Sequence, residues 1–521
     1  MIHGKNLIGV TTSALGSNTF NSYHVVEKKV IPNDFFEATA SEIDAAVTKA
    51  SMAFNAYKNI STKQRAVFLE TIAEEIEVLD MELINTASIE TGLPIARITG
   101  ERGRATSQLR LFAEMLHNGS WVNAIIDTAI PERKPLPRAD IRQMQIAIGP
   151  VAVFGASNFP LAFSVAGGDT VAALAAGCPV VFKAHPAHPA TCELVGSAII
   201  CAAKKCNMPD GVFSMLHGVS HQVGHTLVAH QLIRAVGFTG SLKGGKALFD
   251  IAVKRNEPIP VFAEMSSVNP VVFLPEIIEQ SAAVLAENFA SSIVLGGGQF
   301  CTNPGIFIVV DNEHTQNFIT LLKNALEAKP AVPLLTPGIG QSYCGGIQAQ
   351  RNTAGANGLT PFDEAIPQPH LLQTTVQMVM DNPSLTEEVF GPSTVAIVAG
   401  NMDELIECCM QLHGQLTATV HGTSNDLKNA AKLLEVLQSK AGRLVINGFP
   451  TGVEVCNAMV HGGPYPATTD MRTTSVGTQA IYRFTRPVCY QDFPEYLLPD
   501  ALKESNPLKI TREVNGRIEL A

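Results

Sequence analysis

The spacing of apolar residues near the N-terminus predicts amphipathic helices. In the first helix the apolar positions recur four or three residues apart, on one face: Ile43, Val47, Ala50, Phe54 and Tyr57. Thr39 and Glu42 form the capping-box pattern that begins such a helix. Further helices are expected over about residues 62–80 and in GERGRATSQLRLFAEML, which spans residues 100–116.

From about residue 148 the apolar residues form short continuous runs instead. Such runs, separated by helix-length segments, are typical of parallel strands buried on both faces, whose ligands bind at the strands' carboxyl ends. The first series is IGPVAVFG, PVVFKAHP, GVFSMLHG, AVGFTGS and PVFAEMSS. A second series begins near residue 271 and comprises NPVVFLP, GIFIVVD, TVAIVAG and RLVING. Beyond about residue 475, IYRFTRPVCYQDF predicts an extended edge segment.

Composition narrows the class of protein. The length of 521 residues predicts two to four domains at roughly 150 residues each. A composition of 46% hydrophobic and 16% charged residues favours a large, well-packed enzyme. A net charge of −10 without a basic run argues against nucleic acid or membrane partners. No apolar stretch approaches the ~20 residues of a membrane span, and the N-terminal residues MIHGKNLIGV lack the basic-then-apolar pattern of a signal peptide. Ten cysteines without a C-x-x-C pair favour a cytoplasmic protein.

One cysteine lies in an unusual setting. Cys301 occupies a glycine-rich loop, GGGQFCTNPG at residues 296–305, whereas a structural cysteine is usually a small buried hydrophobe of a helix or strand. Polar residues follow several predicted strands: Asn158 in GASNFP, Lys183 in VFKAHP, the turn GFTGS and Glu264 in PVFAEMSS. Cys301 is therefore a candidate nucleophile, with a merely packed thiol as the alternative.

These motifs together, in this order and followed by EEVFGP at residues 387–392, resemble the aldehyde dehydrogenase superfamily along almost the whole chain. The resemblance implies an α/β fold with a Rossmann-type cofactor domain, an α/β catalytic domain and a β oligomerisation arm. It places the NAD(P)-binding domain at 1–136 and 150–268, the catalytic domain at 269–474, and the arm at 137–149 and 475–500. A homodimer or homotetramer is expected, because the arms of the family pair strands between subunits.

The resemblance also implies the catalytic roles. Cys301 would attack the aldehyde, the Asn158 amide would stabilise the oxyanion together with the Cys301 backbone N–H, and Glu264 would activate water to hydrolyse the thioester. A partly buried Glu264 with a raised pKa would suit that task. The alternatives are a structural ion pair for Glu264 and a turn before proline for Asn158.

A second group of residues is implied in cofactor binding. Gly240, Ser241 and Gly245 would let a helix begin close to the pyrophosphate. Lys183 and Glu388 would hydrogen-bond the two riboses, with Phe390 packed nearby. NAD-preferring relatives commonly carry a glutamate three residues after the lysine, where this chain has Pro186. A 2′-phosphate then meets no repulsion, so either NAD or NADP is expected, with NADP favoured.

Longer stretches such as VFGASNFPLAFSVAGGDT and HGGPYPATTDMR look like the α-ketoglutaric semialdehyde (2,5-dioxovalerate) dehydrogenases. The group includes a fatty-aldehyde dehydrogenase, which is the alternative substrate class. Many relatives have phenylalanine where this chain has His461, which would assist proton transfer or only shape the pocket. A catalytically idle member and a CoA-acylating enzyme are further alternatives, although the set of Cys301, Glu264 and Asn158 argues against both.

Arg104 is the candidate residue for binding a carboxylate group of the substrate. It would line the substrate tunnel on the predicted helix, with Gln108 one turn on along the same face, and a guanidinium binds a carboxylate bidentately. The alternative is that Arg104 only ties the helix to a neighbour such as Glu101. His185-x-x-His188 has the spacing of metal ligands, but two loop histidines without a third ligand predict no metal site.

Overall fold

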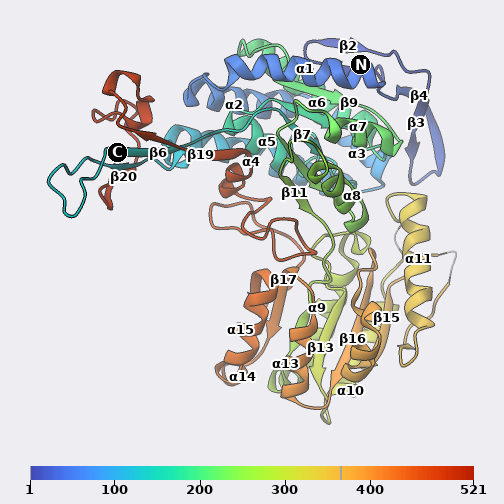
Figure 1. Ribbon diagram of the computed structural model, residues 1–521. Helices are drawn as coiled ribbons and strands as arrows, with labels where there is room; N and C mark the ends of the chain where they lie inside the picture. The colour runs from blue at the N-terminus through green and yellow to red at the C-terminus, as the bar shows by residue number, and fades with distance from the viewer. Residues whose placement is uncertain (1, 332, 364–365, 521) are drawn as a thin grey trace.

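Two large β-sheets and a smaller sheet in a projecting arm organise the protein (Figure 1). The computed structural model describes residues 2–331, 333–363 and 366–520, and these form two seven-stranded sheets, a five-stranded sheet and a two-stranded hairpin. No helix within the described ranges is both long and apolar enough to traverse a bilayer.

The first sheet has a Rossmann-type core. Its order is β11-β10-β7-β8-β9-β1-β2, in which the first five strands are parallel and β1 and β2 are antiparallel additions. The strands are β1 Asn6–Ile8, β2 Thr11–Ser13, β7 Val151–Phe154, β8 Val180–Lys183, β9 Phe213–Leu216, β10 Ala235–Thr239 and β11 Val261–Glu264. The strand order reverses between β7 and β10, which is where doubly wound sheets bind ligands.

Helices cover both faces of this sheet. Alternate residues of each strand point to opposite faces of the sheet and belong to two separate hydrophobic cores. Val180 and Phe182 pack on one face and Val181 on the other. One face is covered by α2 Thr62–Val78, α3 Asp80–Thr91, α4 Ile95–Asn118, α5 Gly168–Ala176 and α6 Pro189–Lys205. The other is covered by α1 Ala40–Tyr57, α7 His221–Ala229 and α8 Leu242–Val253. The predicted capping box of Thr39 and Glu42 is confirmed at the start of α1.

The second sheet is also mostly parallel, in the order β14-β15-β16-β13-β12-β17-β18. Its strands are β12 Val271–Phe273, β13 Ile306–Val310, β14 Asn357–Gly358, β15 His370–Thr375, β16 Ser393–Ala399, β17 Gln415–His421 and β18 Ala441–Ile446. The helices of this part are α9 Pro275–Val294, α10 Thr315–Glu327, α11 Pro337–Arg351, α12 Val376–Asp381, α13 Met402–Gln411, α14 Ser424–Lys428 and α15 Ala431–Lys440. Cys408 and Cys409 are fully buried in α13.

The third sheet forms an arm that projects from the body (Figure 1). Its order is β19-β6-β5-β20-β21, with bounds Ile125–Asp127 for β5, Ile141–Ala147 for β6, Thr485–Gln491 for β19, Arg512–Val514 for β20 and Arg517–Glu519 for β21. The arm thus takes in residues 125–127 and 512–519 in addition to the segments that the sequence assigned to it. The hairpin of β3 Thr19–His24 and β4 Lys29–Phe36 lies beside α3.

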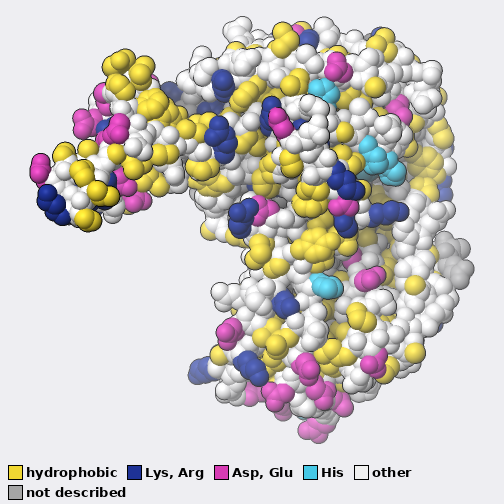
Figure 2. All heavy atoms as spheres, in the orientation of Figure 1, with side chains coloured by type: hydrophobic (Ala, Val, Ile, Leu, Met, Phe, Trp, Pro, Cys, Tyr) yellow, Lys and Arg dark blue, Asp and Glu magenta, His cyan; other side chains and the backbone are white. Residues whose placement is uncertain are grey.

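The arm exposes apolar surface. Strand β19 pairs with β6 on one side and lies at the edge of the sheet. Figure 2 shows hydrophobic side chains gathered over the arm. The large exposed ones are Ile141, Phe493, Tyr496, Leu497, Ile518 and Leu520. An open strand edge beside exposed apolar side chains is a surface that natural proteins usually cover.

Candidate active site

The polar residues predicted at strand ends lie along one edge of the first sheet. Lys183 and Glu264 are the last residues of β8 and β11, Asn158 follows β7, and Ser241 follows β10. Parallel strands bring their carboxyl ends to the same edge, so four separate motifs converge there.

The thiol of Cys301 comes from the second part of the chain, on the loop between the short helix η2 Leu295–Gly298 and β13. The glycines of η2 adopt positive φ, and a Cβ at Gly298 would collide with the Gly391 backbone. Asn269 Nδ2 donates hydrogen bonds to the carbonyl oxygens of Cys301 and Asn303, both at 2.9 Å. The loop is therefore held in a single conformation close to the first sheet.

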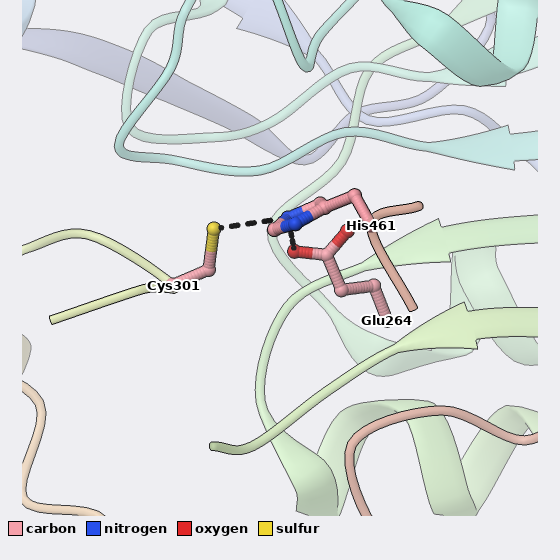
Figure 3. Close-up of side chains that lie close together, drawn as sticks. All are labelled: Glu264, Cys301 and His461. Atoms are coloured by element: carbon pink, nitrogen blue, oxygen red, sulfur yellow. Dashed lines mark hydrogen bonds and ion pairs between the residues drawn. The ribbon is translucent and has the colours of Figure 1, made fainter. Parts of the chain in front are cut away.

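Cys301, His461 and Glu264 meet in one cluster (Figure 3). His461 Nε2 lies 3.3 Å from Cys301 Sγ and 2.9 Å from Glu264 Oε1. Ser475 Oγ donates a 2.7 Å hydrogen bond to the other Glu264 oxygen, Oε2. Glu264 and His461 are each 1% exposed, whereas Cys301 is half-buried. One imidazole nitrogen thus faces both the sulfur and the carboxylate.

The pKa of Glu264 differs from the value expected from the sequence. Burial acts to raise the pKa of Glu264, but the charge and hydrogen bond of His461 and the hydroxyl of Ser475 outweigh it, and the pKa falls below its usual value. The prediction of a raised pKa was wrong because it took burial alone into account. Burial and then the negative charge of Glu264 hold the pKa of the Cys301 thiol well above its usual value, against the opposing charge of Arg104.

Asn158 lies beside the same loop. Its Nδ2 donates a 2.8 Å hydrogen bond to the carbonyl oxygen of Gln299, two residues before Cys301. Gln299 in turn accepts the backbone N–H of Leu335 at 2.9 Å through its own side-chain oxygen. The Asn158 amide is thereby placed next to the thiol loop as a hydrogen-bond donor.

The residues predicted for a dinucleotide surround the N-terminus of α8. Ser241 caps this helix, its Oγ accepting the backbone N–H of Gly244 at 3.2 Å. A Cβ at Gly245 would come within 2.7 Å of Met265, and one at Gly240 within 2.7 Å of the Phe238 ring. These glycines keep the approach to the helix N-terminus narrow and free of side chains, as a bound pyrophosphate requires.

Two ionisable residues flank that approach. Burial lowers the pKa of Lys183 to about 8, which Glu37 and Cys192 partly oppose. Burial raises the pKa of Glu388 to about 7, although Ser266 Oγ donates a 2.6 Å hydrogen bond to it. Phe390, two residues after Glu388, is half-buried. Pro186 occupies the position three residues after Lys183 and supplies no carboxylate there.

Arg104 projects from α4 with part of its guanidinium unused. Its Nε and Nη2 are buried and have no hydrogen-bond partner among the described residues, and its guanidinium carbon lies 5.4 Å from the Phe163 ring centre. Glu101 pairs instead with Arg97, at 2.8 Å, and accepts the backbone N–H groups of Leu161 and Ala162. The alternative of an Arg104–Glu101 tie is therefore not realised as a direct contact.

Gln108, also on α4, is buried beside Gly168, where a Cβ would come within 3.1 Å of Gln108 Nε2. The two histidines with metal-like spacing are packing residues. The rings of His185 and His188 stack, and His188 uses its two ring nitrogens on the Ala156 carbonyl oxygen and on Cys192 Sγ.

Four residues of the site were missed from the sequence. Ser475 contacts Glu264, and Asn269 fixes the thiol loop. Gln415 Oε1 accepts hydrogen bonds from Ser267 Oγ and the backbone of Val268 and Asn269, and so fixes the segment between the sheets. Arg443 donates to the carbonyl oxygens of Pro450 and Gly452 and keeps a buried Nε without a partner in the part of the chain that the structure describes. Asn269 and Arg443 are the first residues of NPVVFLP and RLVING, which the sequence analysis singled out as strands without assigning either residue to the site.

Comparison with known proteins gives the family. The model of the aldehyde dehydrogenase family matches residues 14–470. An α-ketoglutaric semialdehyde dehydrogenase of Acinetobacter baylyi is 50% identical, covering 99% of this chain and 98% of the relative. α-Ketoglutaric semialdehyde dehydrogenase 2 of Azospirillum brasilense is 48% identical, covering 99% of each chain.

Solved structures agree in fold. That of γ-glutamyl-γ-aminobutyraldehyde dehydrogenase from Burkholderia cenocepacia is 22% identical, with a TM-score of 0.79 over 94% of this chain and 97% of that one. With its Rossmann-type sheet, its cysteine loop and a family match over most of its length, the chain belongs to the aldehyde dehydrogenase family, whose members oxidise aldehydes with NAD or NADP.

Proposed function

We propose that the protein oxidises α-ketoglutaric semialdehyde (2,5-dioxopentanoate) to 2-oxoglutarate. The observation that carries the proposal is the identity of about half of all residues, over the full length, to two curated enzymes named for this substrate. The half-buried Arg104, whose Nε and Nη2 can donate hydrogen bonds to a carboxylate, supports a substrate that carries an acid group. A fatty or other aldehyde is the alternative substrate class.

The residues around α8 fit a nicotinamide dinucleotide. Gly240 and Gly245 leave room for the pyrophosphate at the capped helix N-terminus, and Lys183 and Glu388 would hold the riboses. When bound, the nicotinamide ring accepts the hydride. NADP is favoured over NAD, because Pro186 leaves the ribose 2′ position without the carboxylate that repels a phosphate.

The first step in this proposal needs a base for the thiol. With its pKa held well above the usual value, Cys301 is protonated at neutral pH and is a weak nucleophile. His461 Nε2, 3.3 Å from the sulfur, is placed to take the thiol proton, and Glu264 at 2.9 Å would stabilise the resulting imidazolium. The alternative, in which His461 only shapes the pocket, leaves the thiol proton without a near acceptor other than Glu264.

The later steps use the same groups. Attack of Cys301 Sγ on the aldehyde carbon gives a thiohemiacetal, whose oxyanion the Asn158 amide would stabilise. Loss of the hydride leaves a thioester on Cys301. Glu264 then removes a proton from water, which attacks the thioester and releases the acid and the thiol. A lowered pKa keeps Glu264 ionised and ready for this role at neutral pH.

We further propose a homodimer or a dimer of dimers. The open edge of β19 and the exposed apolar residues of the arm support pairing with a second copy of the chain. The nine cysteines other than Cys344 are free thiols, which fits the cytoplasm that we propose as the compartment of the protein.

Kinetics on a small panel tests the substrate. The panel is 2,5-dioxopentanoate, succinic semialdehyde, glutaraldehyde and a long-chain aldehyde, each with NAD and NADP. We expect kcat/KM for 2,5-dioxopentanoate to exceed the others by roughly tenfold or more, and NADP to exceed NAD. A preference for the long-chain aldehyde would establish the alternative class.

Rapid-mixing kinetics separates the roles of Cys301 and Glu264. Cys301→Ala should show neither a burst nor turnover, because no adduct forms. Glu264→Gln should release about one equivalent of reduced cofactor and then stall at the thioester, provided that acylation does not need this carboxylate. Cys206→Ala, which changes a thiol immediately after α6, serves as the control and should behave as the wild type. Normal steady-state turnover in Glu264→Gln would refute the deacylation role.

Arg104→Met tests recognition of the substrate carboxylate. The change should lower kcat/KM for 2,5-dioxopentanoate by roughly tenfold or more, because a charge-assisted contact is lost, and should spare an uncharged aldehyde of similar length. Arg110→Met is the matched control, since Arg110 lies on the same helix and pairs with Glu77 on the surface. Equal losses on both aldehydes would show that Arg104 only holds the helix.

Sedimentation velocity tests assembly. The wild type should sediment as a dimer or tetramer. The double variant Tyr496→Ser/Leu497→Ser should shift the equilibrium toward smaller species, because it removes exposed apolar surface from the arm. Leu15→Ser, an exposed position outside the arm, should leave assembly unchanged. A stable, active wild-type monomer would contradict the proposal.

A further inference from the structure

Three metal-ligating atoms converge at the thiol. Cys301 Sγ, His461 Nε2 and a carboxylate oxygen of Glu264 all lie within 4.8 Å of one another (Figure 3). They come from three separate parts of the chain, the loop before β13, the loop after β18 and the end of β11. The surrounding segments are packed and hydrogen-bonded, so the three atoms are held together before any ligand arrives.

The hydrogen atoms available do not satisfy this arrangement. His461 Nε2 carries at most one hydrogen, yet both the sulfur and the Glu264 oxygen lie within hydrogen-bond distance of it. If that hydrogen points to Glu264, the thiol gains no acceptor on the nitrogen. If instead Nε2 carries no hydrogen, it can accept the thiol hydrogen, but its lone pair then faces the carboxylate oxygen and both compete for that single hydrogen. A cation placed between the three atoms would bind a lone pair of each.

The distances suit a zinc ion. With bonds of about 2.3 Å to sulfur and about 2.0 Å to nitrogen and oxygen, tetrahedral ligand atoms lie about 3.3–3.5 Å apart. The observed separations of 3.3 Å between sulfur and nitrogen and 2.9 Å between nitrogen and oxygen are within a few tenths of an ångström of these values, and the sulfur and the carboxylate oxygen lie within 4.8 Å of each other. Thiolate and imidazole are ligands that select Zn²⁺ over Mg²⁺ or Ca²⁺. Three protein ligands leave a fourth position open to water.

We propose that Zn²⁺ binds Cys301, His461 and Glu264 and holds the enzyme in a reversible inactive state. Binding forms three metal–ligand bonds, releases the thiol proton to solvent, and involves no oxidation or reduction. The two negative ligands neutralise the ion, which removes the repulsion between thiolate and carboxylate. Metal binding stands on the cluster alone, whereas the loss of activity rests on the proposed role of Cys301 as nucleophile.

His461 is the ligand on which the proposed zinc-bound state depends. Without its nitrogen only Cys301 and Glu264 would remain, and two protein ligands make a weak zinc site. The ring is fixed by its surroundings: its backbone N–H donates a 2.8 Å hydrogen bond to Thr474 Oγ1, and the Phe163 ring lies 6.1 Å from its centre. Nδ1 is buried and, within the described ranges, has no hydrogen-bond partner, so it can keep the hydrogen while Nε2 binds metal.

Cobalt(II) chloride, added alone to chelator-treated enzyme under a phosphine reductant, is the direct probe. We expect one Co²⁺ per chain, with a thiolate-to-cobalt charge-transfer band in the near ultraviolet and visible bands of tetrahedral cobalt, both abolished by Zn²⁺. Cys301→Ala should lose the charge-transfer band, and His461→Phe should bind at least about a hundredfold more weakly. His413→Phe, which changes an exposed histidine, is the matched control and should bind as the wild type.

Activity then tests the consequence. Zn²⁺ should inhibit turnover of the wild type and of His413→Phe at the concentration that displaces cobalt, and a chelator should restore it. Inhibition of His461→Phe at the same zinc concentration would overturn the proposal, because the metal would then be acting on the thiol alone. Absence of a Cys301-dependent cobalt spectrum would overturn it as well. A normal cobalt spectrum in an enzyme that oxidises no aldehyde would instead refute the proposed function and leave the metal site standing.

Discussion

The buried hydrogen bond between His461 Nε2 and Glu264 Oε1 is the interaction on which the site depends. It joins residues 197 positions apart in the sequence and links the last residue of β11 to the loop after β18. It keeps Glu264 ionised despite burial, and it turns the imidazole toward the thiol. When the imidazole hydrogen lies on Nδ1 instead, Nε2 can take the thiol proton in the proposed reaction or give a metal its third ligand in the proposed inactive state.

The cluster exists only where two α/β units meet. Glu264 belongs to the first sheet, whereas the thiol lies on a loop that leads into the second. Gln415 and Asn269 fix the segment between them through hydrogen bonds to Ser267, Val268 and the carbonyl oxygen of Cys301. Because a displacement of about 1 Å of a reacting group can cost a hundredfold in rate, these hydrogen bonds matter to the proposed chemistry although none of them touches the reacting atoms.

Much of the fold could be predicted from the sequence because its signals are local. The apolar runs at β7 to β11 and the capping box of α1 act over a few residues, and the ends of parallel strands bring Lys183 and Glu264 to one edge by topology alone. The contacts of Ser475 and Gln415 could not be predicted, because their partners lie far away in the sequence. The pKa of Glu264 was predicted with the wrong sign for the same reason, since its sign depends on His461 and Ser475.

The partners of Arg97, Arg104 and Arg443 differ, and the difference has an energetic consequence. Arg97 pairs with Glu101, and Arg443 on β18 donates to two carbonyl oxygens, so both side chains have hydrogen-bond partners within the protein. Among the described residues, Arg104 faces the Phe163 ring and its Nε and Nη2 have no hydrogen-bond partner, and burial lowers its pKa. A partly buried guanidinium without a hydrogen-bonded anion costs stability in the free protein. A substrate carboxylate would relieve that cost, so part of the affinity for an acid-bearing aldehyde would come from pairing this buried charge.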